Sequence, residues 1–377
     1  MSELSVMMVG DLVLDEPDPD FFFALSRDTL QSADIVVGHV ETPYTLRGSE
    51  LQSDVPAEAA DPAKIAALAR AGFHAASLAG NHVFDRGNEG VEDTIAALQQ
   101  NAIVPFGAGL NLQTARAPAV LERAGKRFGF LSYNCVGPKD SWASASKGGC
   151  AYVHVLSHYE QEGANPGGPP LVYTFATPAT LEAMQADIAH LRSQVDVLVV
   201  ALHKGLVHTP VTLAMYERPV ARAAIEAGAD IVIGHHPHMT RGIEFYQGKP
   251  IFHGLGNFVT VTRALNVEAN AHPARLAWAE RRRKLFGFTP DPDSQVYPFH
   301  PDSKNTMIAD CRIDEAGRIS TGFRPCRILP TGQPEVLGNT ERGRAVADYI
   351  LQISHDAGMK VDFAWDGERV IVSEAHA

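Results

Sequence analysis

The sequence has few cysteines, no broad cluster of basic residues and no long hydrophobic run. Its 377 residues include four cysteines without a C-x-x-C pair, so we expect free thiols in a reducing compartment. Lys and Arg total 32 against 44 Asp and Glu, and the net charge of −12 argues against a nucleic-acid or anionic-membrane partner. The one basic run, residues 281–284, is interpreted as the solvated face of a helix.

The apolar segments are too short for a membrane span or a secretory signal. The first of them ends at Gly10 and Asp11 after a handful of residues, and no basic residue precedes it. No other segment approaches the length of a transmembrane helix. These features predict a soluble, cytoplasmic protein.

Short apolar runs rich in β-branched residues alternate with helical patterns. The predicted strands cover residues 4–9, 34–38, 75–79, 127–133, 195–202 and 229–234. The predicted helices cover residues 21–31, 61–73, 177–193 and 218–230. Strands that are apolar throughout and alternate with helices indicate a layered α/β fold whose sheets are covered on both faces.

The pattern changes after residue 262. A helical pattern over 269–288 is followed by a Pro- and Asp-rich loop, 289–303, and by two hairpin patterns, the second turning at Asp366-Gly367. We therefore expect a main domain over 1–262 and a C-terminal extension, 263–377, packed on that same domain. The Gly/Pro-rich segment 162–170 is predicted to be a surface loop.

Polar side chains that can bind metals follow five of the predicted strands. In chain order they are Asp11, His39, Glu41, Asn81, His82, His203, His235, His236 and His238. Each one alone is more simply a cap, a turn residue or a satisfied core residue. Because ligands bind beyond the carboxyl ends of strands in α/β sheets, their recurrence at five strand ends favours one shared site. Imidazole, carboxylate and amide oxygen without thiolate suit Mn, Fe(II), Zn or Ca.

The segment "GHHPH" carries the densest group of candidate ligands. Pro237 is expected to hold the backbone extended, so that His236 and His238 are presented from a rigid segment. His238 is the stronger candidate, and the spacing favours His236 over His235 as the second histidine that faces the metal. The predicted metal ligands are Asp11, Glu41, Asn81, His82, His203, His236 and His238.

Several motifs together resemble the CapA family, named for poly-γ-glutamate capsule synthesis, within the calcineurin-like metallophosphoesterase fold. They are "VGDLVLD", "GHVETP", "AGFHAASLAGNHVFDRGNEGVEDTIAAL", "VVALHKG", "EAGADIVIGHHPH" and "IFHGLGNFV", which span roughly residues 5 to 260. The resemblance implies a four-layer α/β/β/α sandwich with a metal site at the sheet edge.

The sequence departs from a two-metal phosphoesterase at two positions. Asp11 is followed by Leu12 and Val13 instead of the Asp-x-His pattern, and "GHVE" lacks the bridging Asp of GD-x-x-D. His39 stands where CapA-like chains usually have Asn. Without one histidine and the bridging carboxylate, a single divalent cation is expected rather than a pair.

The resemblance implies a metal-dependent enzyme that acts on a peptide or polyglutamate-type amide substrate. The reaction would be hydrolysis or related processing, or epimerisation at Cα, as in lasso-peptide epimerases that share the fold. Candidates for catalytic roles are Asp11, His39, His82, Asp85 and His300. His300 lies in a polar loop able to fold over the site, although an exposed loop histidine is the commoner case.

Two alternatives remain open from the sequence. One is a phosphoesterase whose missing ligands come from elsewhere, for instance from His253. The other is a non-catalytic, metal-stabilised accessory protein of capsule biosynthesis.

Overall fold

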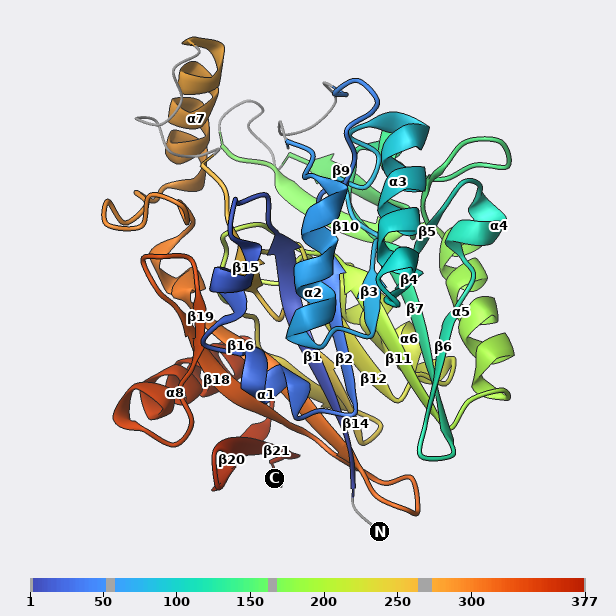
Figure 1. The fold of residues 1–377 in the computed structure, drawn as a ribbon, viewed down its shortest axis with the longest axis vertical. Helices are drawn as coiled ribbons and strands as arrows, with labels where there is room; N and C mark the ends of the chain where they lie inside the picture. The colour runs from blue at the N-terminus through green and yellow to red at the C-terminus, as the bar shows by residue number, and fades with distance from the viewer. Residues whose placement is uncertain (1–2, 52–57, 162–167, 264–272, 376–377) are drawn as a thin grey trace.

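The computed structural model describes residues 3–51, 58–161, 168–263 and 273–375. They form two large sheets that face each other, with helices on the outer sides (Figure 1). The larger sheet has the order β20-β21-β18-β16-β1-β2-β3-β4, and the smaller has the order β13-β14-β12-β11-β7-β6.

The larger sheet contains eleven strands. They are β1 (Leu4–Val13), β2 (Ile35–Val40), β3 (Ala75–Ser77), β4 (Val104–Phe106), β15 (Asn257–Thr260), β16 (Asn305–Ile313), β17 (Ile319–Ser320), β18 (Gly322–Ile328), β19 (Pro334–Val336), β20 (Val361–Asp366) and β21 (Arg369–Glu374). The six strands of the smaller sheet are β6 (Ala119–Arg123), β7 (Lys126–Asn134), β11 (Val197–His203), β12 (Ile231–His235), β13 (Ile243–Tyr246) and β14 (Lys249–Phe252). Two small pairs stand apart: β5 (Ala108–Gly109) with β8 (Gly149–Cys150), and β9 (Val155–Glu160) with β10 (Leu171–Ala176).

The described helices fall into two outer layers and the C-terminal part. The α-helices are α1 (Arg27–Gln31), α2 (Ile65–Ala71), α3 (Gly87–Gln100), α4 (Leu112–Ala115), α5 (Pro178–Arg192), α6 (Glu217–Glu226), α7 (Pro273–Phe286) and α8 (Glu341–Asp356). The 3-10 helices are η1 (Pro19–Phe23), η2 (Pro62–Lys64), η3 (Lys139–Ser141) and η4 (Pro301–Lys304). No helix in the described ranges is long and apolar enough to cross a membrane.

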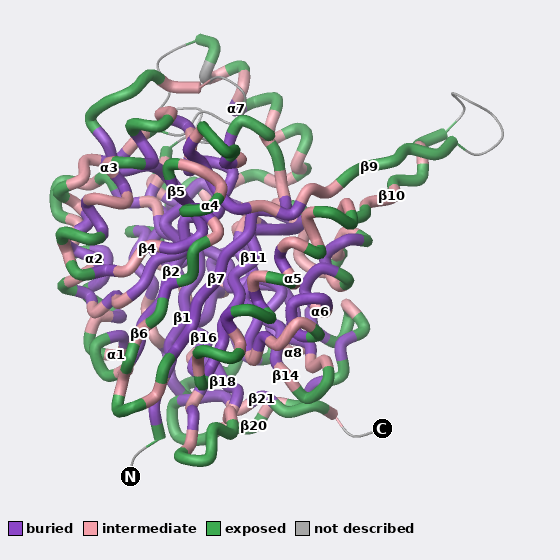
Figure 2. The backbone as a smooth tube through the Cα atoms, turned by 90° about the vertical axis from the view of Figure 1, so that its right-hand side faces the viewer, coloured by how far each residue is buried: buried purple, intermediate pink, exposed green. Residues whose placement is uncertain are grey.

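The alternation of side chains along each central strand explains the layers. In β11, Val199 packs between the two sheets, whereas its neighbour Val200 packs beneath α5 and α6. In β1, Met8 faces the other sheet and Met7 belongs to the cluster beneath α2 and α3. Each such side chain contributes roughly 1.5–3 kcal/mol by leaving water. The predicted four-layer α/β/β/α sandwich is confirmed. Its central strands consist mainly of buried residues (Figure 2).

The C-terminal residues continue the larger sheet. β16 pairs antiparallel with β1, and β18 and β21 follow in order, with α8 packed against β18 and β20. The predicted hairpin at Asp366-Gly367 is confirmed, because Gly367 has a left-handed φ of 60° between the paired strands β20 and β21. Of the predicted loop 162–170, residues 162–167 lie outside the described residues, as do residues 269–272 of the predicted helix.

The predicted helix over 21–31 is only partly present. The structure has η1 and the short helix α1 there instead, separated by a turn. Phe22 and Phe23 are both buried in the core while Phe21 is exposed, so packing of adjacent phenylalanines replaces one continuous amphipathic face.

β1 also runs four residues beyond its predicted end. Its register against β2 shifts between Met8 and Asp11, and Asp11 N donates to Gly256 O at 3.0 Å. A Cβ at Gly10 would lie 1.8 Å from Gly256 O, so only glycine allows this approach. The close approach carries Asp11 to the edge where the other parallel strands end.

Candidate metal centre

Asp11 lies at the centre of the candidate site. Its side chain is fully buried, and neither carboxylate oxygen has a hydrogen-bond partner within the described part of the chain. Burial, followed by the nearby Glu41 carboxylate, raises the pKa of Asp11 well above its usual range, although His238 opposes the rise. A buried carboxylate without a hydrogen bond is costly, and a bound cation would reduce that cost. The residues therefore fit a metal ion.

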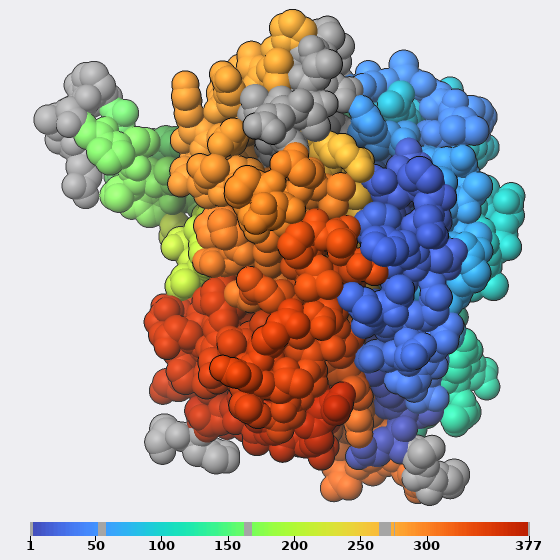
Figure 3. Space-filling view, turned by 60° about the vertical axis from the view of Figure 1, so that its left-hand side comes forward, coloured from blue at the N-terminus to red at the C-terminus, as the bar shows by residue number. Residues whose placement is uncertain are grey.

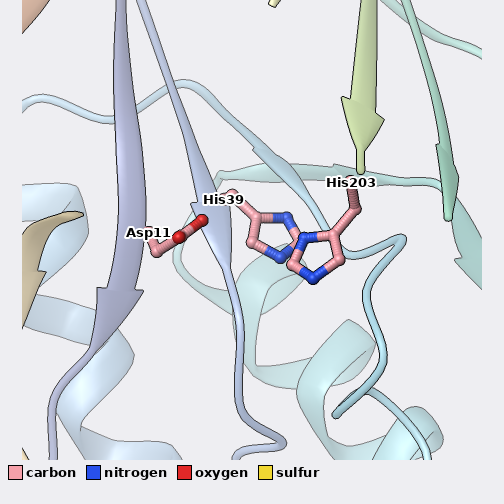
Figure 4. Close-up of side chains that lie close together, drawn as sticks. All are labelled: Asp11, His39 and His203. Atoms are coloured by element: carbon pink, nitrogen blue, oxygen red, sulfur yellow. The ribbon is translucent and has the colours of Figure 1, made fainter. Parts of the chain in front are cut away.

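Two groups of possible ligands share Asp11. The first is Asp11, His39 and His203, whose ligand atoms lie within 4.8 Å of one another (Figure 4). The second is Asp11, Glu41 and His238, which meets the same limit. His238 Nε2 lies 3.3 Å from Glu41 Oε1, and its Nδ1 lies 3.4 Å from Asp11 Oδ2. Because both groups contain Asp11, they could hold one ion between them or one ion each. The expectation of a single ion therefore stays a prediction.

His39 lies near the end of β2, and a chain of two serine hydroxyls holds its Nδ1. Its Nδ1 lies 3.2 Å from Ser77 Oγ, which lies 2.7 Å from Ser132 Oγ. The His39 ring packs 4.6 Å from the ring of His203 and 4.9 Å from that of His235. Burial, followed by the other histidines, lowers the pKa of His39 well below its usual range. His39 is therefore neutral, which is the form that binds metals.

A third set of ligand atoms lies beside His39. His203 Nε2 is 2.8 Å from Asn81 Oδ1 and 3.2 Å from His236 Nδ1. Burial lowers the pKa of both His203 and His236 well below the usual range. These separations are close to those between ligand atoms on one metal ion, so all three can contribute to the site.

The "GHHPH" loop differs from its predicted form. His236 and His238 have φ values of 92° and 54°, so the expectation of an extended backbone on both sides of Pro237 is wrong. Such left-handed conformations cost about 1–3 kcal/mol each and are common at functional sites. His235 packs on His39 and lies 3.3 Å, at Nε2, from Val9 O. The turn thus directs His236 and His238 toward the other candidate ligands and leaves His235 in a packing position.

His82 and Asp85 form a buried pair in the loop between β3 and α3. His82 Nδ1 lies 2.7 Å from Asp85 Oδ2. A carboxylate at Nδ1 fixes the orientation and tautomer of an imidazole and increases its basicity. The pair is close enough to Asp11 for the charge of His82 to act on its pKa.

His300 contacts Asp302 and Phe288. Its Nδ1 accepts the backbone N–H of Asp302 at 3.1 Å, and its ring packs 5.2 Å from that of Phe288. The neighbouring Phe299 instead contacts the site, with its ring 5.1 Å from the ring of His238. The loop does approach the metal centre, but through Phe299 rather than through His300.

Asn257, at the start of β15, is a site residue that the sequence patterns did not identify. Its Oδ1 lies 2.9 Å from His238 Nδ1, and its Nδ2 donates to Tyr297 Oη at 2.9 Å. By holding Nδ1, Asn257 turns His238 Nε2 toward Glu41. The pair Gly256-Asn257 repeats the pair Gly80-Asn81, and that repetition was the available signal.

A buried network of charged and polar side chains lies next to the ends of β11 and β12, which carry candidate ligands. Lys204 is fully buried, and its Nζ donates to Glu217 Oε2 at 3.0 Å and to His253 Nδ1 at 3.1 Å. His253 Nε2–H donates to Glu244 Oε2 at 2.8 Å. His253, considered above as a substitute ligand, belongs to this network. Lys204 N also donates to His235 O at 3.0 Å, which joins the ends of β11 and β12.

Glu244, at the end of this network, is expected to make the stability of the protein depend on pH in acid. Hydrogen bonds from His253 and Arg222 outweigh desolvation and lower the pKa of Glu244 from 4.5 to about 2. Because the folded state favours the ionised form, this contribution is complete above pH 4.5 and is lost as the pH falls through about 2. We expect Glu244→Gln to lower the free energy of unfolding by about 2 kcal/mol at pH 7 and to flatten its pH dependence in that window.

Denaturant unfolding measured at a series of pH values checks this expectation. Glu226→Gln is the matched control, because Glu226 accepts only an exposed hydrogen bond from Tyr246 Oη. An equal pH dependence in the Glu244 variant and the wild type would contradict the proposed contribution.

The fold and the site define an α/β/β/α protein with a carboxylate- and histidine-rich candidate metal site at the sheet edge. The family model described as "Bacterial capsule synthesis protein PGA_cap" matches residues 5–262. Since that match covers more than half of the sequence, the chain belongs to this family, and the resemblance to CapA is confirmed.

Curated relatives share part of their length with this chain. The PGA biosynthesis protein CapA of Bacillus subtilis is 27% identical over 266 residues, which are 68% of this chain and 63% of that protein. A probable polyglutamine synthesis accessory protein of Mycobacterium tuberculosis is 29% identical over 234 residues, 60% of this chain and 56% of that protein. The chain thus spans less than two thirds of the length of either relative.

Solved structures with a similar arrangement are distant in sequence. The calcineurin-like phosphoesterase YfkN from Bacillus subtilis is 15% identical, with a TM-score of 0.38 over 94% of this chain and 97% of that chain. The NAD nucleotidase of Haemophilus influenzae is 14% identical, with a TM-score of 0.42 over 93% of this chain and 63% of that chain.

Proposed function

We propose that this protein is a metal-dependent enzyme that acts on a peptide or polyglutamate-type amide substrate by acid/base chemistry. The observation that carries the proposal is Asp11, a fully buried carboxylate whose oxygens have no hydrogen-bond partner among the described residues and which two ligand groups share. The family description as a capsule synthesis protein, and the relatives' names as PGA biosynthesis and polyglutamine synthesis proteins, support the substrate class.

The charges of the ligands support one resident ion. Asp11 and Glu41 supply two negative charges, while the other candidate ligands are neutral imidazoles and an amide. One divalent cation balances two carboxylates, whereas two cations would leave excess positive charge in a buried site. We assign Asp11, Glu41 and His238 as its primary ligands. The neighbouring candidate ligands, which surround the ion in this assignment, are His39, Asn81, His203 and His236. A bound cation would polarise a substrate carbonyl and stabilise negative charge on its oxygen.

The chain supplies proton transfer next to that position. Asp85 holds His82 at Nδ1, and we assign His82 Nε2 the transfer of a proton to or from the substrate. Hydrolysis needs one such group to activate water. Epimerisation needs a second group on the opposite face of Cα. With the ion held by Asp11, Glu41 and His238, His39 is the candidate, because Ser77 holds its Nδ1 and Nε2 is then not a ligand.

One assay separates these reactions. The protein, loaded with Mn, is incubated in D₂O with a γ-linked glutamate decamer or with mixed α-peptides, and the products are analysed by mass spectrometry. Chain cleavage would indicate hydrolysis. Uptake of a single deuterium without cleavage would indicate proton exchange at Cα. If metal is bound but neither product forms from any substrate, the proposed activity is wrong and an accessory role is favoured.

His82 variants test the assigned proton transfer. We expect His82→Gln to lower turnover by about 10²–10⁴-fold, because it removes the proton carrier. Asp85→Asn should lower it by about 10–100-fold, because it removes only the orienting carboxylate. The exposed His190 on α5 provides the matched control, His190→Gln, which should retain full activity. Full activity in His82→Gln would exclude the assigned role.

Phosphoester hydrolysis is the second candidate, and one observation favours it. Two ligand groups that share a carboxylate are what a pair of ions would require. Turnover of p-nitrophenyl phosphate with Mn, together with a second bound ion when inorganic phosphate is present, would support this candidate over the first.

A further inference from the structure

β9 and β10 form a hairpin that projects from the body of the protein, and we call their residues 155–160 and 171–176 the arm (Figures 2 and 3). The two strands pair antiparallel from Val155 with Ala176 to Glu160 with Leu171, and they form a separate two-stranded sheet. Its base is tied to the body, since Thr177 N donates to His154 O at 2.7 Å and Trp142 stacks on Tyr152 at 4.4 Å. The arm also contacts the body at Thr174, whose Oγ1 accepts the N–H of Tyr216 at 3.3 Å, and most residues farther from the base are exposed.

The arm exposes several large apolar side chains. Its large exposed hydrophobic side chains are Leu156, Tyr159, Leu171, Val172 and Phe175. Tyr159 is 64% exposed and Phe175 is 49% exposed. Glu160 is the only Asp, Glu, Lys or Arg in the twelve residues of the arm. Apolar side chains occur on both faces, because Leu156 pairs with Phe175 on one face and Tyr159 pairs with Val172 on the other.

Such a surface is unusual for a free hairpin. A two-stranded sheet alone is marginally stable in water and normally needs another strand or a packed helix. Exposed edge strands are usually protected by charged residues, prolines or bulges within the strand. The paired strands here carry one charge and no proline, so the sequence of the arm is suited to being covered.

We propose that the arm is a self-association surface on which two copies of this chain pair about a twofold axis. An edge strand is complementary to itself in the antiparallel direction, so the same strand of two copies can pair without a different partner. The near absence of charge removes local repulsion between identical surfaces. The apolar side chains of two arms, with their backbone edges, would bury on the order of 1,000 Å², which is close to the minimum for a specific interface. The proposal is independent of the enzymatic function.

Sedimentation velocity tests the proposal on the full chain. We expect the wild type to sediment at twice its monomer mass of 40.6 kDa at micromolar concentration. Leu156→Asp/Phe175→Asp should sediment as a monomer, and so should Tyr159→Lys/Val172→Lys, which alters the opposite face. Leu46→Asp is the control, because Leu46 is 81% exposed and lies outside the arm, and it should remain dimeric.

Two results would overturn the proposal. One is a wild type that remains monomeric up to about 100 µM, a concentration at which even weak specific pairs associate; that result would direct the search to a different occupant, such as an extended peptide. The other is a dimer that both double variants retain. Unchanged thermal unfolding of each variant at low concentration shows that a loss of dimer does not come from misfolding.

Discussion

Asp11→Asn is expected to stabilise the metal-free protein and to abolish its response to divalent cations. The pKa of Asp11 is higher in the folded state than its ordinary value of 3.8, mainly because of burial. The proton-linked stabilisation is therefore complete below pH 3.8 and is lost as the pH rises through the raised value. At pH 7 this raised pKa costs the folded state free energy, whether the buried carboxyl is ionised or keeps its proton. A neutral amide of similar shape should therefore raise the free energy of unfolding by about 1–3 kcal/mol.

The same substitution removes the carboxylate that both groups of candidate metal ligands share. We expect wild-type Tm to rise when Mn or Zn is added, and the affinity of the variant to fall by more than about 100-fold. Thermal unfolding with and without metal measures both effects. Asp15→Asn, at an exposed position four residues away, should behave as the wild type does. Equal metal-induced stabilisation of the Asp11 variant would show that the ion binds elsewhere.

Lys204→Met is expected to cause the largest loss of stability. Lys204 and Glu217 form an ion pair in which both side chains are fully buried. Removing Lys204 leaves the Glu217 carboxylate in the interior without its ion pair, although the charge of Arg241 still favours it. Breaking a buried pair in this way typically costs about 3–5 kcal/mol. Chemical denaturation of the metal-free variants measures the cost separately from any change in metal binding.

Two further variants separate the ion pair from general damage. Lys204→Met/Glu217→Gln removes both charges and should recover a large part of the loss. Lys249→Met breaks an ion pair with Asp230 in which Lys249 is substantially exposed, and it should cost less than about 1 kcal/mol. Single and double Lys204 variants of equal stability would contradict an uncompensated charge as the cause.

The fold was largely predictable because its central strands are covered on both faces. Residues of β1 and β11 alternate between two apolar layers, so their sequences are apolar throughout and each strand ends where polar residues begin. The same principle predicted that Asp11, His39 and His203 would converge, because parallel strands finish at one edge.

The supporting residues were not predictable in the same way. Lys204 and His253 are 49 positions apart, and nothing local in the sequence indicates that they bond in the interior. Similarly, the contact between Asn257 and His238 depends on the register of β15 against β1. The left-handed φ values of His236 and His238 are imposed by the position of the loop, whereas Pro237 suggested an extended backbone.

The metal content of the protein, purified without a chelator or a histidine tag and analysed by plasma mass spectrometry, tests the central claim most directly. We predict about one equivalent of a divalent cation in the wild type and almost none in Asp11→Asn. Two equivalents in the absence of substrate would contradict the single ion that the charges of Asp11 and Glu41 support. If the wild type binds no metal after incubation with Mn, Zn and Ca, the assignment of Asp11 and the surrounding histidines as a metal centre is wrong.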